Sequence, residues 1–190
     1  DGGIKLLEVT FNQESEDTIL DTLKSIELIK RKYGNRVCLG VGTVLTVEQV
    51  NKAVNAGAEY MISPNTDVEV IAKTKELGKI SIPGATSASE MVIAYNAGAD
   101  IIKLFPAGIL GVDYIKSLLS PLNYIPITAV GGINLDNVDQ FIKAGAKGVG
   151  IGGNLVDKKA IYAGQYDKIT KAAKAYVEKI ESVSLALSHA

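Results

Sequence analysis

Short apolar runs alternate with longer amphipathic stretches along the whole of this 190-residue chain. Each short run is followed by polar or capping residues and then by a helix-like stretch. This order is typical of a parallel sheet that is covered by helices. We therefore expect seven strands, within residues 4–11, 37–44, 60–64, 80–84, 101–105, 127–132 and 148–153.

The expected helices carry recognisable starts and ends. The tripeptide AGA closes three of them, at 56–58, 97–99 and 144–146, and a Gly just past a helix is the usual C-terminal cap. The spacing of these triplets varies, which argues against a solenoid. The residues expected to start helices are followed soon by Glu or Asp, and they are Ser15, Thr46, Thr66, Ser87 and Asn134.

The number of strand–helix units favours a barrel. Gly2 and Gly3 precede the first expected strand as the AGA triplets precede later ones, so a strand and helix absent from this sequence would bring the units to eight. We expect an α/β protein, a (β/α)8 TIM barrel lacking its first strand and helix in this chain. It would form one domain over residues 1–190, with a short C-terminal tail from about residue 182 that continues the last helix.

An open doubly wound sheet is the competing architecture. The run from Gly148 to Gly153 even has the spacing of the dinucleotide-binding fingerprint. These glycines, however, lie inside and at the end of the last expected strand, and no strand with a ribose-binding acid follows. The barrel is therefore favoured.

The charge balance excludes several classes of partner. Twenty Lys and Arg are interspersed with twenty-one Asp and Glu, so neither nucleic acid nor an anionic membrane is an expected partner. No apolar run approaches the roughly 20 residues of a membrane span and no secretory signal opens the chain, so we expect a cytoplasmic location. The lone Cys38 is expected to be a small buried thiol.

The single histidine, His189, is the penultimate residue, which argues against a histidine-based triad or metal site. We expect no metal and no cofactor. Chemistry would then have to use Lys, Glu, Asp, Ser, Thr or Tyr side chains.

Lys103 stands inside the run DIIKLFPA, between Ile102 and Leu104. Burial of an ammonium is costly, so it lowers the pKa of a lysine and leaves a nucleophilic amine suited to Schiff-base chemistry. Alternation along a strand would turn Lys103 and Phe105 towards one interior face. The alternative is a strand-end lysine whose stem lies on apolar surface and whose head reaches water.

Glu8 shares one strand face with Ile4, Leu6 and Thr10, so we expect it among apolar neighbours. A carboxylate in such surroundings has a raised pKa or a cationic partner, and either suits general acid and base catalysis. A purely structural ion pair is the alternative. A buried lysine nearby would satisfy both interpretations.

The ends of other expected strands could bind a ligand. Glycine-rich turns after the last two strands could offer backbone N–H groups to a phosphate, with a side-chain donor from Asn154, or could simply be tight turns. Thr43 and Pro64 would lie at the carboxyl ends of two other strands, where they could equally be a helix cap and a strand stop. The glycines concerned are Gly131, Gly132, Gly152 and Gly153.

The strings GGIKLLEVTF, GVGTVL, ISPN, IPGATSASE, IIKLFPA, VGGI and IGGNLV occur in this order, and the likeness extends to about Ala173. They resemble the bacterial class I aldolases for 2-keto-3-deoxy-6-phosphogluconate (KDPG) and 4-hydroxy-2-oxoglutarate (KHG). The LEVT glutamate and the KLFPA lysine are the most specific pair.

This resemblance implies a homotrimeric barrel that cleaves KDPG to pyruvate and glyceraldehyde 3-phosphate, or KHG to pyruvate and glyoxylate, without a metal. The substrate would be a small keto acid, phosphorylated in the first case. Lys103 matches the Schiff-base lysine and Glu8 the general acid and base. Residues matched to the pyruvate end are Thr43, Pro64 and Phe105, and those matched to the phosphate cradle are Gly131, Gly132, Gly152, Gly153 and Asn154.

Two positions depart from the resemblance. Asn12 stands where many members have Arg, so a cation for the substrate carboxylate is missing, and Val130 stands where Thr is frequent. Other functions also remain open from the sequence. One is a non-catalytic phosphate-binding barrel in which Lys103 is only a countercharge, and another is a different phosphate-handling barrel enzyme, such as one of thiazole or tryptophan synthesis.

Overall fold

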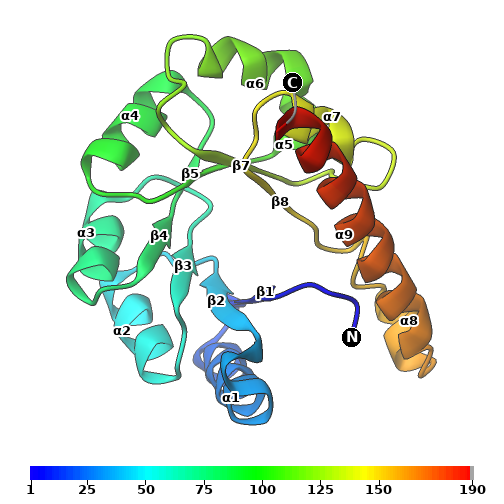
Figure 1. Cartoon of the computed structure of the whole chain (residues 1–190). Coiled ribbons are helices and arrows are strands. Elements are labelled where there is room, and N and C mark those ends of the chain that lie inside the picture. Colours follow the sequence, from blue (N-terminus) through cyan, green and yellow to red (C-terminus); the bar gives the residue numbers. More distant parts are fainter. Residues whose placement is uncertain (189–190) are drawn as a thin grey trace. The chain divides into compact units, whose positions relative to one another are not determined.

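The computed structural model describes residues 1–188, so His189 lies outside the described part of the chain. The chain forms two compact units: Lys5–Lys103 make one, and residues 1–4 together with the chain from Leu104 onwards make the other. Strands and helices alternate through both units (Figure 1). Within residues 1–188, no helix combines the length and the apolar character needed to cross a membrane.

A parallel sheet organises the first unit. Its strands are hydrogen-bonded in the order β1-β2-β3-β4. Glu8 lies opposite Gly40, and Thr10 lies opposite Gly42. The bounds of these strands are β1 Leu6–Thr10, β2 Cys38–Gly42, β3 Tyr60–Ile62 and β4 Ile80–Ile82; β5 Gly84–Ala85 and β6 Ile102–Leu104 follow.

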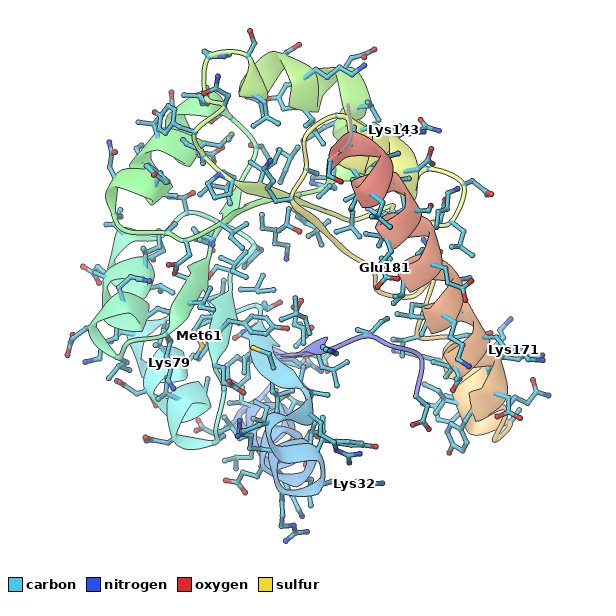
Figure 2. The ribbon with its side chains drawn as sticks, viewed as in Figure 1. Lys32, Met61, Lys79, Lys143, Lys171 and Glu181 are labelled. Atoms are coloured by element: carbon cyan, nitrogen blue, oxygen red, sulfur yellow. The ribbon has the colours of Figure 1, made fainter. Side chains whose placement is uncertain are left out.

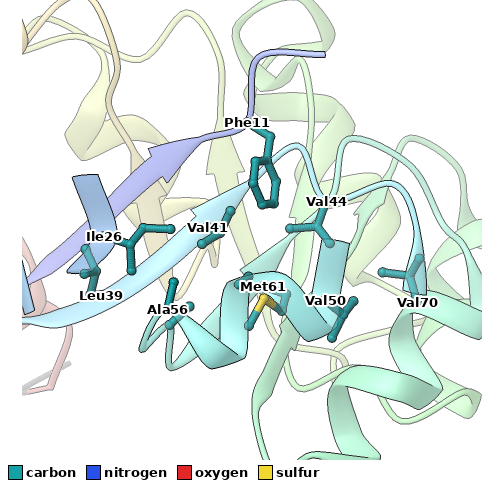
Figure 3. Packing of buried hydrophobic residues seen from close by; sticks show 11 residues of the cluster. Phe11, Ile26, Leu39, Val41, Val44, Val50, Ala56, Met61 and Val70 are labelled. Atoms are coloured by element: carbon teal, nitrogen blue, oxygen red, sulfur yellow. The ribbon is translucent and has the colours of Figure 1, made fainter. Parts of the chain in front are cut away.

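Helices of the first unit bury one face of this sheet. Phe11 just after β1, Val41 of β2 and Met61 of β3 pack in one cluster with apolar residues from the helices that follow these strands (Figure 3). Leu7 and Val9 of β1 contact this cluster from its edge. The helical segments are α1 Glu16–Tyr33, η1 Gly34–Arg36, α2 Val47–Asn55, α3 Val68–Glu76 and α4 Ala88–Asn96.

The second unit repeats the strand–helix pattern. Strand β7 pairs in parallel with β8, placing Val130 opposite Gly150. The long last helix packs on α7 and α8. The elements are α5 Ala107–Leu110, α6 Val112–Leu119, β7 Ile127–Val130, α7 Val138–Lys143, β8 Gly148–Gly150, α8 Lys158–Tyr162 and α9 Tyr166–Ser188.

Most local predictions are confirmed. Every expected strand contains an observed one, and the tail continues α9 as a helix to Ser188. The glycines of the three AGA triplets, Gly57, Gly98 and Gly145, have φ of 105°, 102° and 110°, the left-handed region that favours glycine. The side chains of Lys32 in the first unit and Lys171 in the second are exposed and point away from the ribbon (Figure 2).

Two predicted helix starts are wrong. Asp67, not Thr66, caps α3, because its Oδ1 accepts from the N–H groups of Glu69 and Val70, while the Thr66 hydroxyl donates to Gly84 O at 2.8 Å. Helix α7 begins after Asn137 rather than after Asn134. The Asn134 side chain instead closes a local turn by accepting from Asp136 N at 2.8 Å.

The expectation of a buried thiol is also wrong, since Cys38 is only half-buried. Cys38 is the register partner of Leu6 on the neighbouring strand β1, and Leu6 is itself exposed. Partial burial still raises the pKa of the Cys38 thiol, with a smaller contribution from the negative charge of Glu59.

The left-handed helix ends should matter for stability. Gly98→Ala should lower the free energy of unfolding by about 1–2 kcal/mol, because an L side chain is strained at this φ. Gly152→Ala is the matched control, since Gly152 is not left-handed and an added Cβ would have open space around it. Urea denaturation of both variants measures the difference; equal stabilities would contradict the argument.

Candidate active site

Lys103 is buried in the middle of β6. The residue is only 8% exposed, and its neighbours Ile102 and Leu104 are fully buried. Its backbone N–H donates to Pro83 O at 2.8 Å, which fixes the strand at this point. Burial lowers the pKa of the Lys103 ammonium, and the negative charge of Glu8 opposes this shift. The predicted burial of the lysine is therefore confirmed.

Glu8 projects from β1 and interacts electrostatically with Lys103. Burial of its carboxyl group raises the pKa of Glu8, whereas the positive charge of Lys103 and a 3.4 Å hydrogen bond from the Thr10 hydroxyl lower it. The net pKa of Glu8 lies above its ordinary value. The two groups thus favour each other's charged forms, while burial disfavours both charges.

The expected apolar surroundings of Glu8 are wrong. Leu6, on the same strand face, is 67% exposed, and the Glu8 side chain also remains accessible to solvent. The apolar packing of β1 occurs on its other face, through Leu7 and Val9. Glu8 therefore combines access to solvent with enough surrounding protein to raise its pKa.

Two glycines of β2 make room for the Glu8 carboxylate and for the ring of Tyr60. A Cβ added at Gly42 would lie 1.6 Å from Glu8 Oε1, and one added at Gly40 would lie 2.0 Å from the ring of Tyr60. Any side chain at either position would displace Glu8 or Tyr60. Alternating glycines on one strand face thus create the space in which the Glu8 carboxylate lies.

Tyr60 is a site neighbour that the sequence analysis missed. It begins β3 opposite Gly40 and is only 5% exposed. Burial, and after it the negative charge of Glu8, raises the pKa of the Tyr60 hydroxyl. The GVG pattern of β2 could have indicated this residue, because a glycine in one strand leaves space for a large side chain of the neighbouring strand.

Thr43 and Pro64 follow the carboxyl ends of β2 and β3, as predicted. Thr43 has φ of 58°, a left-handed conformation that is a genuine outlier for a β-branched residue and costs about 1–3 kcal/mol. Its carbonyl accepts a 2.8 Å hydrogen bond from Gln13 Nε2. Ser63, which precedes Pro64, donates its hydroxyl to Val44 O at 2.7 Å.

Asn12 is held within its own loop. Its Nδ2 donates to Glu14 Oε2 and its Oδ1 accepts from Glu14 N, each at 3.1 Å. The loop after β1 therefore presents a neutral amide at the position where the resemblance leads one to expect a cation.

The remaining predicted residues belong to the second unit. Gly131 has φ of 89°, and a Cβ there would lie 3.0 Å from the ring of Phe105, which is 39% exposed. Gly132 has φ of 75°, and Gly108 N donates to Gly131 O at 2.8 Å. This turn needs glycine both for its backbone conformation and for the close approach of Phe105.

The glycines after β8 differ from those after β7. An added Cβ at Gly152 or Gly153 would contact nothing within 4 Å, so the described fold does not itself demand glycine there. Asn154 Nδ2 donates to Ile133 O at 2.7 Å and so joins this loop to the turn after β7. Val130 lies beside Gly150, where a Cβ would approach its Cγ2 to 2.8 Å.

Comparison with known proteins identifies the family of the chain. The family model for KDPG and KHG aldolases matches residues 1–172. A 2-dehydro-3-deoxy-6-phosphogalactonate aldolase of Escherichia coli K12 is 32% identical over 182 residues, covering 95% of this chain and 86% of its own length. A 2-dehydro-3-deoxy-phosphogluconate aldolase of Treponema pallidum is 35% identical over 171 residues, covering 89% and 78%.

Solved structures are similar as well. The structure called "Native KDPGal structure" has a TM-score of 0.85 and 33% identity, over 97% of this chain and 85% of that one. A KDPG aldolase of Legionella pneumophila, with pyruvate captured at low pH as a covalent carbinolamine, has a TM-score of 0.81 and 30% identity, over 92% and 82%. These likenesses confirm the predicted α/β fold class with parallel strands.

The matches define the chain as an aldolase, a lyase that acts on carbon–carbon bonds. It belongs to the KDPG and KHG aldolase family.

The coupling between the two charges can be measured directly. Lys103→Met should raise the pKa of Glu8 further, because the ammonium is a charge that lowers it. Carbon-detected NMR titration of labelled glutamate would report the change. Lys24→Met, at an exposed site on α1, is the matched control and should leave the pKa of Glu8 unchanged; an equal response in both variants would refute the coupling.

The strain at Thr43 makes a separate prediction. Thr43→Gly should raise the free energy of unfolding by about 1 kcal/mol, since relief of the left-handed strain exceeds the entropic cost of a new glycine. Chemical denaturation measures the change. A loss of stability would show that the Thr43 side chain contributes more than its backbone conformation costs.

Proposed function

We propose that this protein is a class I aldolase that cleaves a phosphorylated 2-keto-3-deoxy sugar acid to pyruvate and glyceraldehyde 3-phosphate. Lys103 would form the Schiff base and Glu8 would transfer the protons. The observation that carries the proposal is the buried lysine whose pKa is lowered by burial beside a carboxyl group whose pKa is raised.

Lys103 suits the nucleophilic step. An amine must lose its proton before it can attack a ketone, and burial favours the uncharged form. The neutral amine would add to C2 of the keto acid to give a carbinolamine. Loss of water would then give an iminium, whose positive nitrogen withdraws electrons from the C3–C4 bond.

Glu8 suits the proton transfers. Its carboxylate would accept the proton of the C4 hydroxyl while the C3–C4 bond breaks, and the bonding electrons would pass to the iminium to form an enamine. The aldehyde would leave at this step. The Glu8 carboxylic acid would then return the proton to C3, and hydrolysis of the imine would release pyruvate and the lysine.

Binding of the substrate ends would be divided between the loops. Thr43, Pro64 and Phe105 would line the pyruvate end, as the resemblance implies. The space at the Cβ positions of Gly152 and Gly153 is open, which leaves room for a phosphate to approach the backbone of this loop. The donors after β7 would be Gly131 and Gly132, with Asn154 joining the two loops.

The C4 configuration of the substrate is best decided by assay. The relatives include aldolases named for the phosphogluconate and for the phosphogalactonate acid. Asn12 and Val130 alter the polarity of the predicted site. Pyruvate release should be compared for both epimers and for KHG; preference for KHG would contradict the phosphorylated substrate.

We also expect a homotrimer, as the resemblance implies. Light scattering coupled to gel filtration would give the mass of the particle in solution. A monomeric mass would overturn this part of the proposal without affecting the chemistry of Lys103.

Schiff-base formation can be tested without knowing the aldehyde. Incubation with pyruvate and borohydride should add a reduced pyruvate adduct to Lys103, visible by intact and peptide mass spectrometry. Lys103→Ala should abolish the adduct, whereas Lys5→Ala, at an exposed lysine of the same unit, should not. A folded protein without adduct would instead support a phosphate-binding barrel in which Lys103 is a countercharge.

The role of Glu8 has its own test. Glu8→Gln should lower the rate of pyruvate release by about a hundredfold to ten-thousandfold, the usual contribution of one general acid–base group. Gly42→Ala should also lower the rate, because its Cβ would displace the carboxylate. Gly148→Ala is the matched control, since its Cβ would only reach ordinary contact, 3.4 Å from Thr128 Oγ1.

A further inference from the structure

The loop after β2 is fixed by hydrogen bonds from three directions. Val44 N donates to Ile62 O at 3.1 Å, and Val44 O accepts from the Ser63 hydroxyl at 2.7 Å. Leu45 N donates to Gln49 Oε1, and Thr43 O accepts from Gln13 Nε2, each at 2.8 Å. A strained residue such as Thr43 persists only where its surroundings determine its conformation in this way.

Two glutamines connect this loop to the loop after β1. The Gln49 side chain is buried, and its Nε2 donates to Gln13 Oε1 at 2.8 Å. This bond orients the Gln13 amide so that its Nε2 points to Thr43 O. The two amides thus form a directed chain from Leu45 N through Gln49 and Gln13 to Thr43 O.

Helix capping explains only part of this chain. Thr46 caps α2, because its hydroxyl accepts from Gln49 N at 3.2 Å. Burying a primary amide is costly unless its groups are hydrogen-bonded, and Gln49 uses both ends of its amide on the two site loops. The Oε1 of Gln49 bonds the backbone just before the cap, much as in a capping box, whereas its Nε2 and the Gln13 amide act on Thr43.

The composition of the loops makes the position of Thr43 critical. Asn12 offers no positive charge, and its amide is already bonded to Glu14. A carboxylate bound near the end of β2 would therefore depend on neutral donors, whose strength falls steeply with misalignment.

We infer that Gln49 and Gln13 are positioning residues that hold Thr43 in its left-handed conformation for binding the carboxylate end of the keto acid. This inference rests on the proposed function. Neither glutamine touches the reacting atoms, so both act through Thr43.

The experiment measures the borohydride-trapped adduct on Lys103 as a function of pyruvate concentration. Gln49→Glu keeps the acceptor for Leu45 N but replaces the donor to Gln13 by an oxygen, and Gln13→Leu removes the bond to Thr43. Each should raise the half-saturating pyruvate concentration about tenfold or more, within the hundredfold that a 1 Å misplacement can cause. The maximal extent of adduct should stay that of the parent protein, because Lys103 is not altered.

The controls separate the possible outcomes. Gln165→Leu, at an exposed glutamine before α9, should leave the concentration dependence unchanged. Unchanged half-saturation in both Gln49→Glu and Gln13→Leu would overturn the inference while leaving the Schiff-base lysine intact. A parent protein that forms no adduct would overturn the proposed function and the inference together. If Gln49→Glu does not fold, Gln13→Leu decides, because Gln13 is exposed.

Discussion

Burial and mutual attraction shift the pKa values of Lys103 and Glu8 in opposite directions, and the candidate site of the first unit depends on this opposition. Burial disfavours the charge on each group, and each charge partly restores the other. The pKa of the amine is therefore lowered and the pKa of the carboxyl group is raised. The neighbouring strand β2 makes this arrangement possible, because Gly42 leaves space for the Glu8 carboxylate and Gly40 leaves space for the Tyr60 ring.

The candidate site combines rigid and strained parts. Strands β1, β2 and β6 place the two titrating groups, whereas the loop after β2 keeps Thr43 in a conformation that its side chain disfavours. Strain of this kind lowers stability, so its presence at a strand end next to Glu8 favours a functional explanation. The glutamine pair supplies the hydrogen bonds that such a conformation requires.

The relatives indicate the type of reaction, an aldol cleavage, but not which sugar acid is the substrate. Curated relatives named for two different sugar acids match this chain at similar identity, so identity alone does not separate them. Two positions depart from the resemblance: Asn12, which the structure shows bonded to Glu14, and Val130, which lies beside Gly150. Specificity would therefore be set by a few side chains on a shared scaffold.

Local sequence patterns were enough to predict the strands, the helix ends at Gly57, Gly98 and Gly145, and the burial of Lys103, because these follow from periodicity and backbone preference. Tertiary structure alone decided that Tyr60 lies over Gly40, that Leu6 is exposed and that Gln49 reaches Thr43 through Gln13. The first two observations depend on the register and packing of the strands. The third depends on two loops that bring Gln13 and Gln49 together, and no local sequence pattern encodes such contacts.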